Sequence, residues 1–70
     1  APNPGTTGPS TRARVLDAAE RLVARHGAAH LTLDAVAADA GVSKGGLLYH
    51  FRSKEALLAA MVDRYLAGLD

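Results

Sequence analysis

Apolar positions recur at helical spacing along most of the chain, in blocks that glycine, serine and threonine separate. The first block lies between Thr11 and His26, and its apolar residues form one face of a helix: Val15, Leu16, Ala19, Leu22 and Val23. Ser10 or Thr11 caps the start, and Gly27 follows basic residues, as a left-handed C-terminal cap does. The pattern therefore predicts an amphipathic helix over residues 11–26.

Two shorter blocks predict two short helices joined by a tight turn. Thr32 is a good N-cap for a helix over residues 33–40, and Ser43 for a helix over residues 44–50. Gly41 lies between them and permits the positive φ that a tight turn often needs. This is the layout of a helix-turn-helix unit, whose second helix enters the major groove of DNA.

A fourth block predicts a helix from residue 54 to the end of the sequence, with Ser53 as its N-cap. Its apolar positions are Leu57, Leu58, Met61, Val62, Tyr65, Leu66 and Leu69. Leu66 and Leu69 extend the apolar stripe beyond the reach of a three-helix core, so we expect this helix to lead to a further, C-terminal domain. With no strand or hairpin pattern in the sequence, the predicted fold is all-α: a helix-turn-helix domain over residues 11–53 and a fourth helix over 54–70.

Composition narrows the protein class without identifying a partner. Seventy residues make one small domain at most, and residues 1–10, rich in proline and glycine, are predicted to be a disordered arm or tail. The absence of cysteine rules out a disulfide or thiolate metal site and fits a cytoplasmic location. No apolar run approaches the length of a membrane span, and the sequence does not begin like a signal peptide.

The net charge is only +1, but the positions of the charged residues along the chain say more about a partner. No acidic residue occurs between Asp39 and Glu55, whereas Lys44, His50, Arg52 and Lys54 lie inside that window. A domain with one anion-facing side has this charge pattern. Arg12 and Arg14 precede or begin the first helix, where surface charges are a more common role than contacts in a minor groove.

Gly45 and Gly46 stand side by side in the third predicted helix, where each destabilises a helix interior by about 1 kcal/mol relative to alanine. We interpret them as a place where the backbone approaches DNA; the alternative is a frayed turn. Lys44 can donate to guanine and Leu48 can pack on a thymine methyl group. Candidate phosphate contacts are Thr32, Ser43, Tyr49, His50, Arg52 and Lys54.

Two of these phosphate contacts have competing explanations. Tyr49 also suits a half-buried aromatic ring with its hydroxyl in water. His50 near a helix C-terminus is stabilised by the helix dipole without any ligand.

The stretch GVSKGGLLYHFRSKEALL resembles the signature of TetR-family bacterial transcription regulators, close to the pattern GVSKGTLYYHFxSKEALL. The resemblance extends back through RVLDAAERLVARHGAAHLTLDAVAADA and covers roughly residues 11–69. It implies a homodimeric repressor that binds a palindromic operator and is released by a small-molecule ligand of a larger C-terminal domain. It also implies base contacts around Lys44, Gly46 and Leu48, and phosphate contacts around Thr32, Ser43, Tyr49, His50 and Lys54. Gly46 and Leu48 depart from the family pattern, and both departures reduce hydrogen bonding by the reading helix.

Other kinds of site find little support. His26 and His30 are four residues apart, but Gly27 breaks the helix between them, so a metal pair is not expected. Asp17 and Glu20 lie beside Arg14 and Arg21 and are interpreted as surface ion pairs. We therefore predict no cofactor and no enzymatic activity. The alternative to DNA binding is a protein–protein module that docks through the apolar stripe of the fourth helix.

Overall fold

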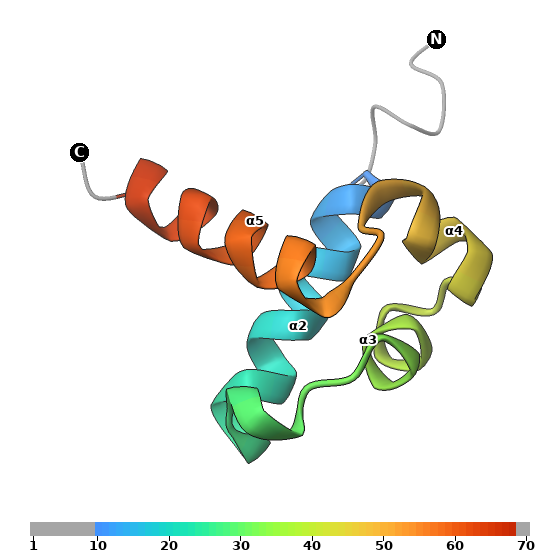
Figure 1. The fold of residues 1–70 in the computed structure, drawn as a ribbon, viewed down its shortest axis with the longest axis horizontal. Coiled ribbons are helices and arrows are strands. Elements are labelled where there is room, and N and C mark those ends of the chain that lie inside the picture. The colour runs from blue at the N-terminus through green and yellow to red at the C-terminus, as the bar shows by residue number, and fades with distance from the viewer. Residues whose placement is uncertain (1–9, 69–70) are drawn as a thin grey trace, which may run out of the picture.

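The computed structural model describes residues 10–68, which form four α-helices and one short 3₁₀ helix (Figure 1). In chain order these are α2 (Thr11–His26), η1 (Ala28–His30), α3 (Leu33–Ala40), α4 (Lys44–His50) and α5 (Lys54–Ala67). The part of the chain that the structure describes contains no strand, and the all-α prediction is confirmed. The predicted arm over residues 1–9 and the last apolar position, Leu69, lie outside the described residues.

Each α-helix begins after a hydroxyl side chain that accepts a hydrogen bond from a free backbone N–H of the first turn. The donors are the N–H groups of Ala13, Ala35, Gly46 and Ala56, and the acceptors are Ser10, Thr32, Ser43 and Ser53, at 3.0–3.1 Å. Of the two caps considered for the first helix, Ser10 is the one that forms this bond.

The two glycines that end helices differ in conformation. Gly41 has φ 72° and ψ 33°, the left-handed conformation expected of a tight turn, and Val42 N–H donates back to Ala37 O at 3.0 Å. Gly27 also has a positive φ of 87°, but its ψ of 154° is extended, so the prediction of a left-handed cap there is wrong. The chain instead leaves α2 in an extended step and enters η1, where the sequence indicated only a connector.

The core lies where α2 meets the other three α-helices. Its buried apolar side chains are Val15, Leu16, Ala18, Ala19, Leu31, Val36, Ala37, Ala40, Leu47, Phe51, Leu57 and Ala60. Leu31, which the sequence placed in a connector, is buried, whereas Leu22 and Val23 only flank the core. The connector therefore contributes a buried leucine to the core.

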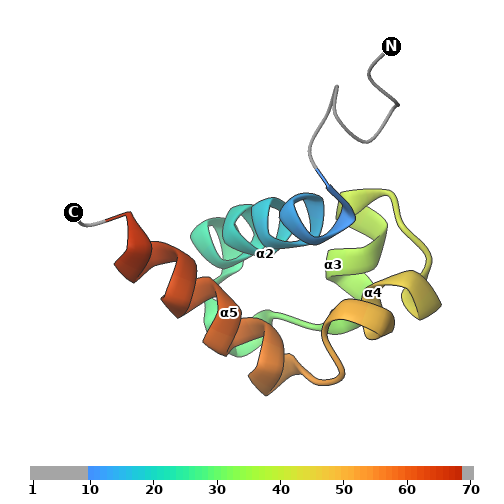
Figure 2. The same ribbon diagram turned by 90° about the horizontal axis from the view of Figure 1, so that it is seen from above.

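In Figure 1, α3 and α4 lie to the right of α2 and α5 extends to the left; in Figure 2, α4 and α5 both lie below α2, and α5 runs away from α4. This arrangement leaves the α3–turn–α4 unit free of α5 along its outer surface. No α-helix among residues 10–68 is long and apolar enough to span a bilayer.

Candidate nucleic-acid interface

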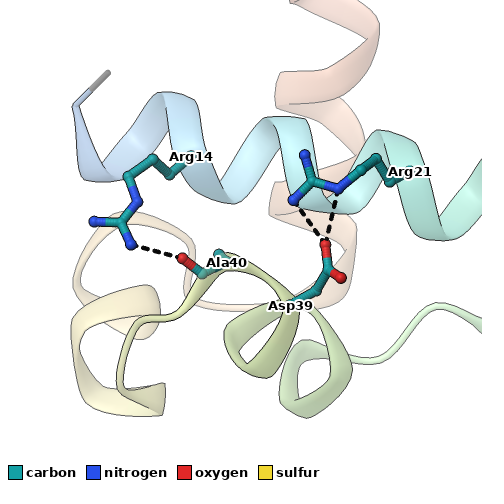
Figure 3. Close-up of polar contacts among 4 residues, drawn as sticks. All are labelled: Arg14, Arg21, Asp39 and Ala40. Atoms are coloured by element: carbon teal, nitrogen blue, oxygen red, sulfur yellow. Dashed lines mark hydrogen bonds and ion pairs between the residues drawn. The ribbon is translucent and has the colours of Figure 1, made fainter. Parts of the chain in front are cut away.

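The end of α3 that leads into the turn is held by two arginines of α2 (Figure 3). Arg14 Nη2 donates to the backbone oxygen of Ala40 at 2.8 Å, and Arg21 donates from Nε and Nη2 to Asp39 Oδ2 at 3.1 and 2.8 Å. A guanidinium at the last carbonyls of α3 satisfies an otherwise free acceptor and interacts favourably with the negative end of the helix dipole. Arg14 is therefore not a free surface charge, and Arg21 pairs with Asp39, not with Asp17 or Glu20.

The end of α4 is held from α2 as well. The Arg12 guanidinium carbon lies 5.4 Å from the centre of the Phe51 ring, within the range of a cation–π contact. Phe51 is itself buried and its N–H donates to Leu47 O at 2.9 Å, closing the last turn of α4. Both arginines that the sequence left as surface charges or groove contacts thus have intramolecular partners at the helix-turn-helix unit.

The side chains of α4 divide into a buried face and an exposed one. Leu47 is fully buried, whereas Lys44, Gly45, Tyr49 and His50 are exposed. The Tyr49 side chain is 84% exposed, so the alternative of a half-buried ring is wrong. Its ring meets the His50 ring edge to face, with centroids 5.2 Å apart.

Leu48 is only partly available to a base. Its side chain is half-buried and packs against the core. Part of the side chain supports the core and part reaches the surface, so only the exposed part is available for the predicted contact with a thymine methyl group.

The paired glycines have different surroundings. A Cβ added to Gly45 would meet no heavy atom within 4 Å, whereas one added to Gly46 would lie 3.1 Å from Ser43 Oγ. The fold itself gives no reason for glycine at position 45. At Gly46 the Ser43 hydroxyl would have to shift by a few tenths of an ångström to admit a Cβ. Alanine occupies the corresponding position beside the other three N-cap hydroxyls, at Ala13, Ala35 and Ala56, so the cap alone does not require glycine.

The remaining phosphate candidates lie at helix starts. Thr32 and Ser43 are exposed N-caps of α3 and α4, and their hydroxyls already accept N–H groups while keeping their own protons free to donate. Lys54 is half-buried in the first turn of α5, and Arg52 is exposed in the segment that joins α4 to α5. These are the positions that the sequence analysis selected; their contacts with DNA stay a prediction.

One acidic side chain reaches α4 from outside the acid-free window. Asp34 Oδ1 lies 3.1 Å from Lys44 Nζ, joining the first turn of α3 to the first residue of α4. The sequence analysis missed this pair, because a window read along the chain does not include an acid ten positions earlier. The N-cap pattern did predict the starts of both helices, and the crossing of α3 and α4 brings those starts together.

Asp17 and Glu20 do form ion pairs, but with a partner that the sequence did not indicate. Arg64 of α5 donates from Nη2 to Asp17 Oδ1, and its Nε lies 3.4 Å from Glu20 Oε2. The hydrogen bond to Asp17 raises the pKa of the Arg64 guanidinium, so the group stays charged. The predicted partners Arg14 and Arg21 were wrong, since both point to α3.

An apolar groove lies between α2 and α5, away from α4. It encloses about 640 Å³, and the apolar residues among those lining it are Val23, Ala28, Leu58, Met61, Val62, Tyr65 and Gly68. Within α5, the side chains of Val62, Tyr65 and Leu66 are more than half exposed. The predicted apolar stripe therefore continues beyond the core formed by the described residues.

Comparison with known proteins shows which protein family this helix-turn-helix unit resembles. Residues 15–61 match the family described as bacterial regulatory proteins, tetR family. The chain is 42% identical over 53 residues to the HTH-type transcriptional regulator TtgR of Pseudomonas putida, covering 76% of this chain and 25% of TtgR. It is 35% identical over 60 residues to the HTH-type transcriptional regulator UidR of Escherichia coli, covering 86% of this chain and 31% of UidR.

A third relative is the uncharacterized HTH-type transcriptional regulator YerO of Bacillus subtilis, 40% identical over 53 residues, or 76% of this chain and 18% of YerO. The chain thus spans between about a fifth and a third of the length of these three relatives.

Proposed function

Because the chain belongs to the tetR family of bacterial regulatory proteins, which bind DNA to regulate transcription, we propose that α4 lies in the major groove and reads its sequence. The observation that carries this proposal is the exposed start of α4. There, a Cβ added to Gly45 would meet no heavy atom of the described residues within 4 Å. Arg14 of α2 holds the end of α3 before the turn, and Arg12 lies over the Phe51 ring just after α4. A helix with an exposed, bare start suits close approach to a duplex.

In this arrangement the base contacts come from Lys44, from the glycine backbone and from the exposed part of Leu48. The Lys44 ammonium donates to guanine O6 and N7, and Leu48 packs on a thymine methyl group. The phosphate contacts surround them, and their side chains are those of Thr32, Ser43, Tyr49, His50 and Lys54. Phosphate contacts position the protein on the duplex but carry no sequence information.

For the whole protein we propose a homodimeric repressor that binds a palindromic operator in the bacterial cytoplasm and is released by a small-molecule ligand. This chain spans 25% of TtgR. The ligand-binding part would correspond to the remaining length of such relatives. The 70-residue chain alone should bind weakly, because joining two half-sites raises affinity through effective concentration. The activity proposed is binding, with no catalysis and no cofactor.

The exposed apolar residues of α5 favour a second function, docking of a partner protein in the groove between α2 and α5. The two functions use different surfaces, since no residue of α3 or α4 lines the groove. A docking module has no need of Lys44, Tyr49 and Lys54 around an open helix start, whereas a DNA-binding domain needs them.

Fluorescence anisotropy of a labelled random-sequence duplex, measured from 50 to 200 mM salt, tests the proposal. Contacts with several phosphates predict that the logarithm of the binding constant falls linearly with the logarithm of the salt concentration, by roughly 0.9 for each phosphate neutralised. Substituting Tyr65→Ala in the groove should leave this slope unchanged. A lack of detectable binding at 50 mM salt would contradict DNA binding by α4. So would a salt slope that changes when Tyr65 is replaced with alanine.

A further inference from the structure

The ion pair between Asp34 and Lys44 lies on the side of the helix-turn-helix unit where α3 and α4 begin. The Oδ1–Nζ distance is 3.1 Å, and the two side chains remain 75% and 57% exposed. Thr32 and Ser43, the two N-cap hydroxyls proposed to contact phosphates, precede these same helix starts. Asp34 therefore places a negative charge on the side of the domain that faces DNA in the proposed function.

Stability does not explain this pair. Ion pairs between exposed side chains contribute little to folding, since water and salt screen them. The crossing of α2, α3 and α4 is already held by Arg14 on Ala40 O, by Arg21 on Asp39 and by Arg12 on the Phe51 ring. A carboxylate in this position must also weaken the attraction of the domain to every phosphate backbone.

We propose that Asp34 is a specificity determinant: it restrains Lys44 and repels phosphates at every duplex site, and this penalty is offset only at a G·C base pair. Such a pair presents guanine O6 and N7, which accept from the Lys44 ammonium, beside the cytosine N4 amino group, which can donate to the Asp34 carboxylate. The ion-paired side chains thus carry a donor and an acceptor that match the two halves of one base pair. This inference rests on the proposed function of α4.

Two duplex pools separate specificity from general affinity. One is an unselected pool of random 20-base-pair duplexes, and the other is the same pool after enrichment on the wild-type chain. For Asp34→Asn we expect affinity for the unselected pool to rise about three- to tenfold at low salt, because one repulsive charge is lost and Lys44 is released. Affinity for the enriched pool should rise less or fall, so the ratio of the two affinities decreases at least about threefold.

The matched control is Asp63→Asn, which removes the same charge from an exposed position on α5. It should leave the ratio of affinities close to that of the wild type. Asp34→Ser serves as a second variant, and circular dichroism verifies that each variant retains its helices. Sequencing of pools enriched on wild type and on Asp34→Asn should show a G·C preference at one position that is stronger for the wild type, because the variant loses the carboxylate but keeps Lys44 as a donor to guanine.

The restraint of Lys44 is tested separately in a Lys44→Met background. If part of the effect of Asp34 runs through Lys44, Asp34→Asn should raise affinity for the unselected pool by a smaller factor in this background than in the wild type, the remainder being direct repulsion of phosphates. An effect of undiminished size would overturn the restraint, and equal gains on both pools would overturn the role in specificity. A wild-type chain that binds neither pool would instead contradict the proposed function itself.

Discussion

Gly41 and Gly45 lie four residues apart and are glycine for different reasons. Gly41 adopts φ 72°, a conformation that a side chain makes unfavourable, and an added Cβ would lie 3.3 Å from Arg14 Nη2. Gly45 has ordinary helical geometry and open space around its Cα. The fold needs the first glycine, whereas no contact within the described residues requires the second.

Replacing Gly45 with alanine should therefore separate stability from binding. We expect Gly45→Ala to stabilise the domain by up to about 1 kcal/mol, because alanine is the better helix former and meets no neighbour. Affinity for duplex DNA should fall by roughly tenfold, equivalent to about 1.4 kcal/mol, because the new methyl group occupies the surface that the duplex approaches. Urea unfolding and fluorescence anisotropy measure the two effects.

Gly41→Ala provides the contrast, with an expected destabilisation of about 1–2 kcal/mol from the left-handed backbone alone. If Gly45→Ala binds DNA as tightly as the wild type, the paired glycines are only a weak point in the helix and the backbone does not approach the duplex.

Lys54 is the side chain whose role as a phosphate contact is easiest to isolate. It lies in the first turn of α5, where a positive charge is unfavourable to the helix dipole, so its presence there calls for another partner. Lys54→Ala should weaken binding to all duplex sequences about equally and reduce the salt slope by about 1. Arg25→Ala removes the same charge from the last turn of α2 and should affect binding less. A loss confined to particular sequences would show that Lys54 contacts bases.

At the scale of the elements, α2 acts as the support on which the helix-turn-helix unit is mounted. Arg14 and Arg21 are two helical turns apart on α2, and they hold two adjacent residues at the end of α3 (Figure 3). The turn at Gly41 follows directly, so the direction in which α4 leaves depends on the position of this end of α3.

Removing the Arg14 guanidinium tests that dependence. Arg14→Ala should destabilise the domain by about 1–2 kcal/mol, because the Ala40 oxygen loses a charged donor. Duplex affinity should also fall without urea, where the variant is fully folded, because α4 is no longer held at one angle. Arg14→Lys, which keeps the charge and one donor, should restore part of both. Unchanged stability and binding in Arg14→Ala would show that packing alone sets the turn.

The sequence predicted those features of the fold that depend on local physics. Thr32 and Ser43 were identifiable as N-caps because capping involves residues only three positions apart. Leu47 was identifiable as buried because its spacing to Phe51 places both on one helix face. The family resemblance then located the candidate interface, and residues 15–61 confirm the family.

The sequence did not predict hydrogen bonds and ion pairs between residues far apart in the chain. Arg14 and Ala40 are 26 residues apart, and the acceptor is a backbone oxygen that no sequence pattern marks. Asp17 and Arg64 are 47 apart, and neighbouring arginines on α2 offered partners that looked equally suitable. Such pairs follow from the crossing angles of the helices, which depend on the whole core and not on any one segment.

At the scale of the whole molecule, charge and apolar surface are separated. The exposed start of α4 and the groove between α2 and α5 are different surfaces, since no residue of α3 or α4 lines the groove. Arg64 holds α5 to α2 through Asp17 and Glu20. We therefore expect substitutions in the apolar stripe of α5 to leave duplex binding unchanged.

The exposed stripe predicts that the chain self-associates at high concentration. Val62, Tyr65 and Leu66 are 56%, 69% and 55% exposed, more apolar surface than a monomeric helix usually presents together. Leu66→Gln should reduce the average mass seen in sedimentation equilibrium at millimolar concentration and leave duplex affinity per monomer unchanged. A wild-type chain that stays monomeric under these conditions would contradict this prediction.

The central claim is that the start of α4, with the helix starts beside it, is the surface that meets DNA. An amide NMR titration of the 70-residue chain with a short duplex, at low and at moderate salt, tests it most directly. We expect chemical-shift changes concentrated at Thr32, at residues 43–50 and at Lys54, and we expect these changes to fade as the salt concentration rises. Changes confined to residues 57–68, or none at either salt concentration, would contradict it.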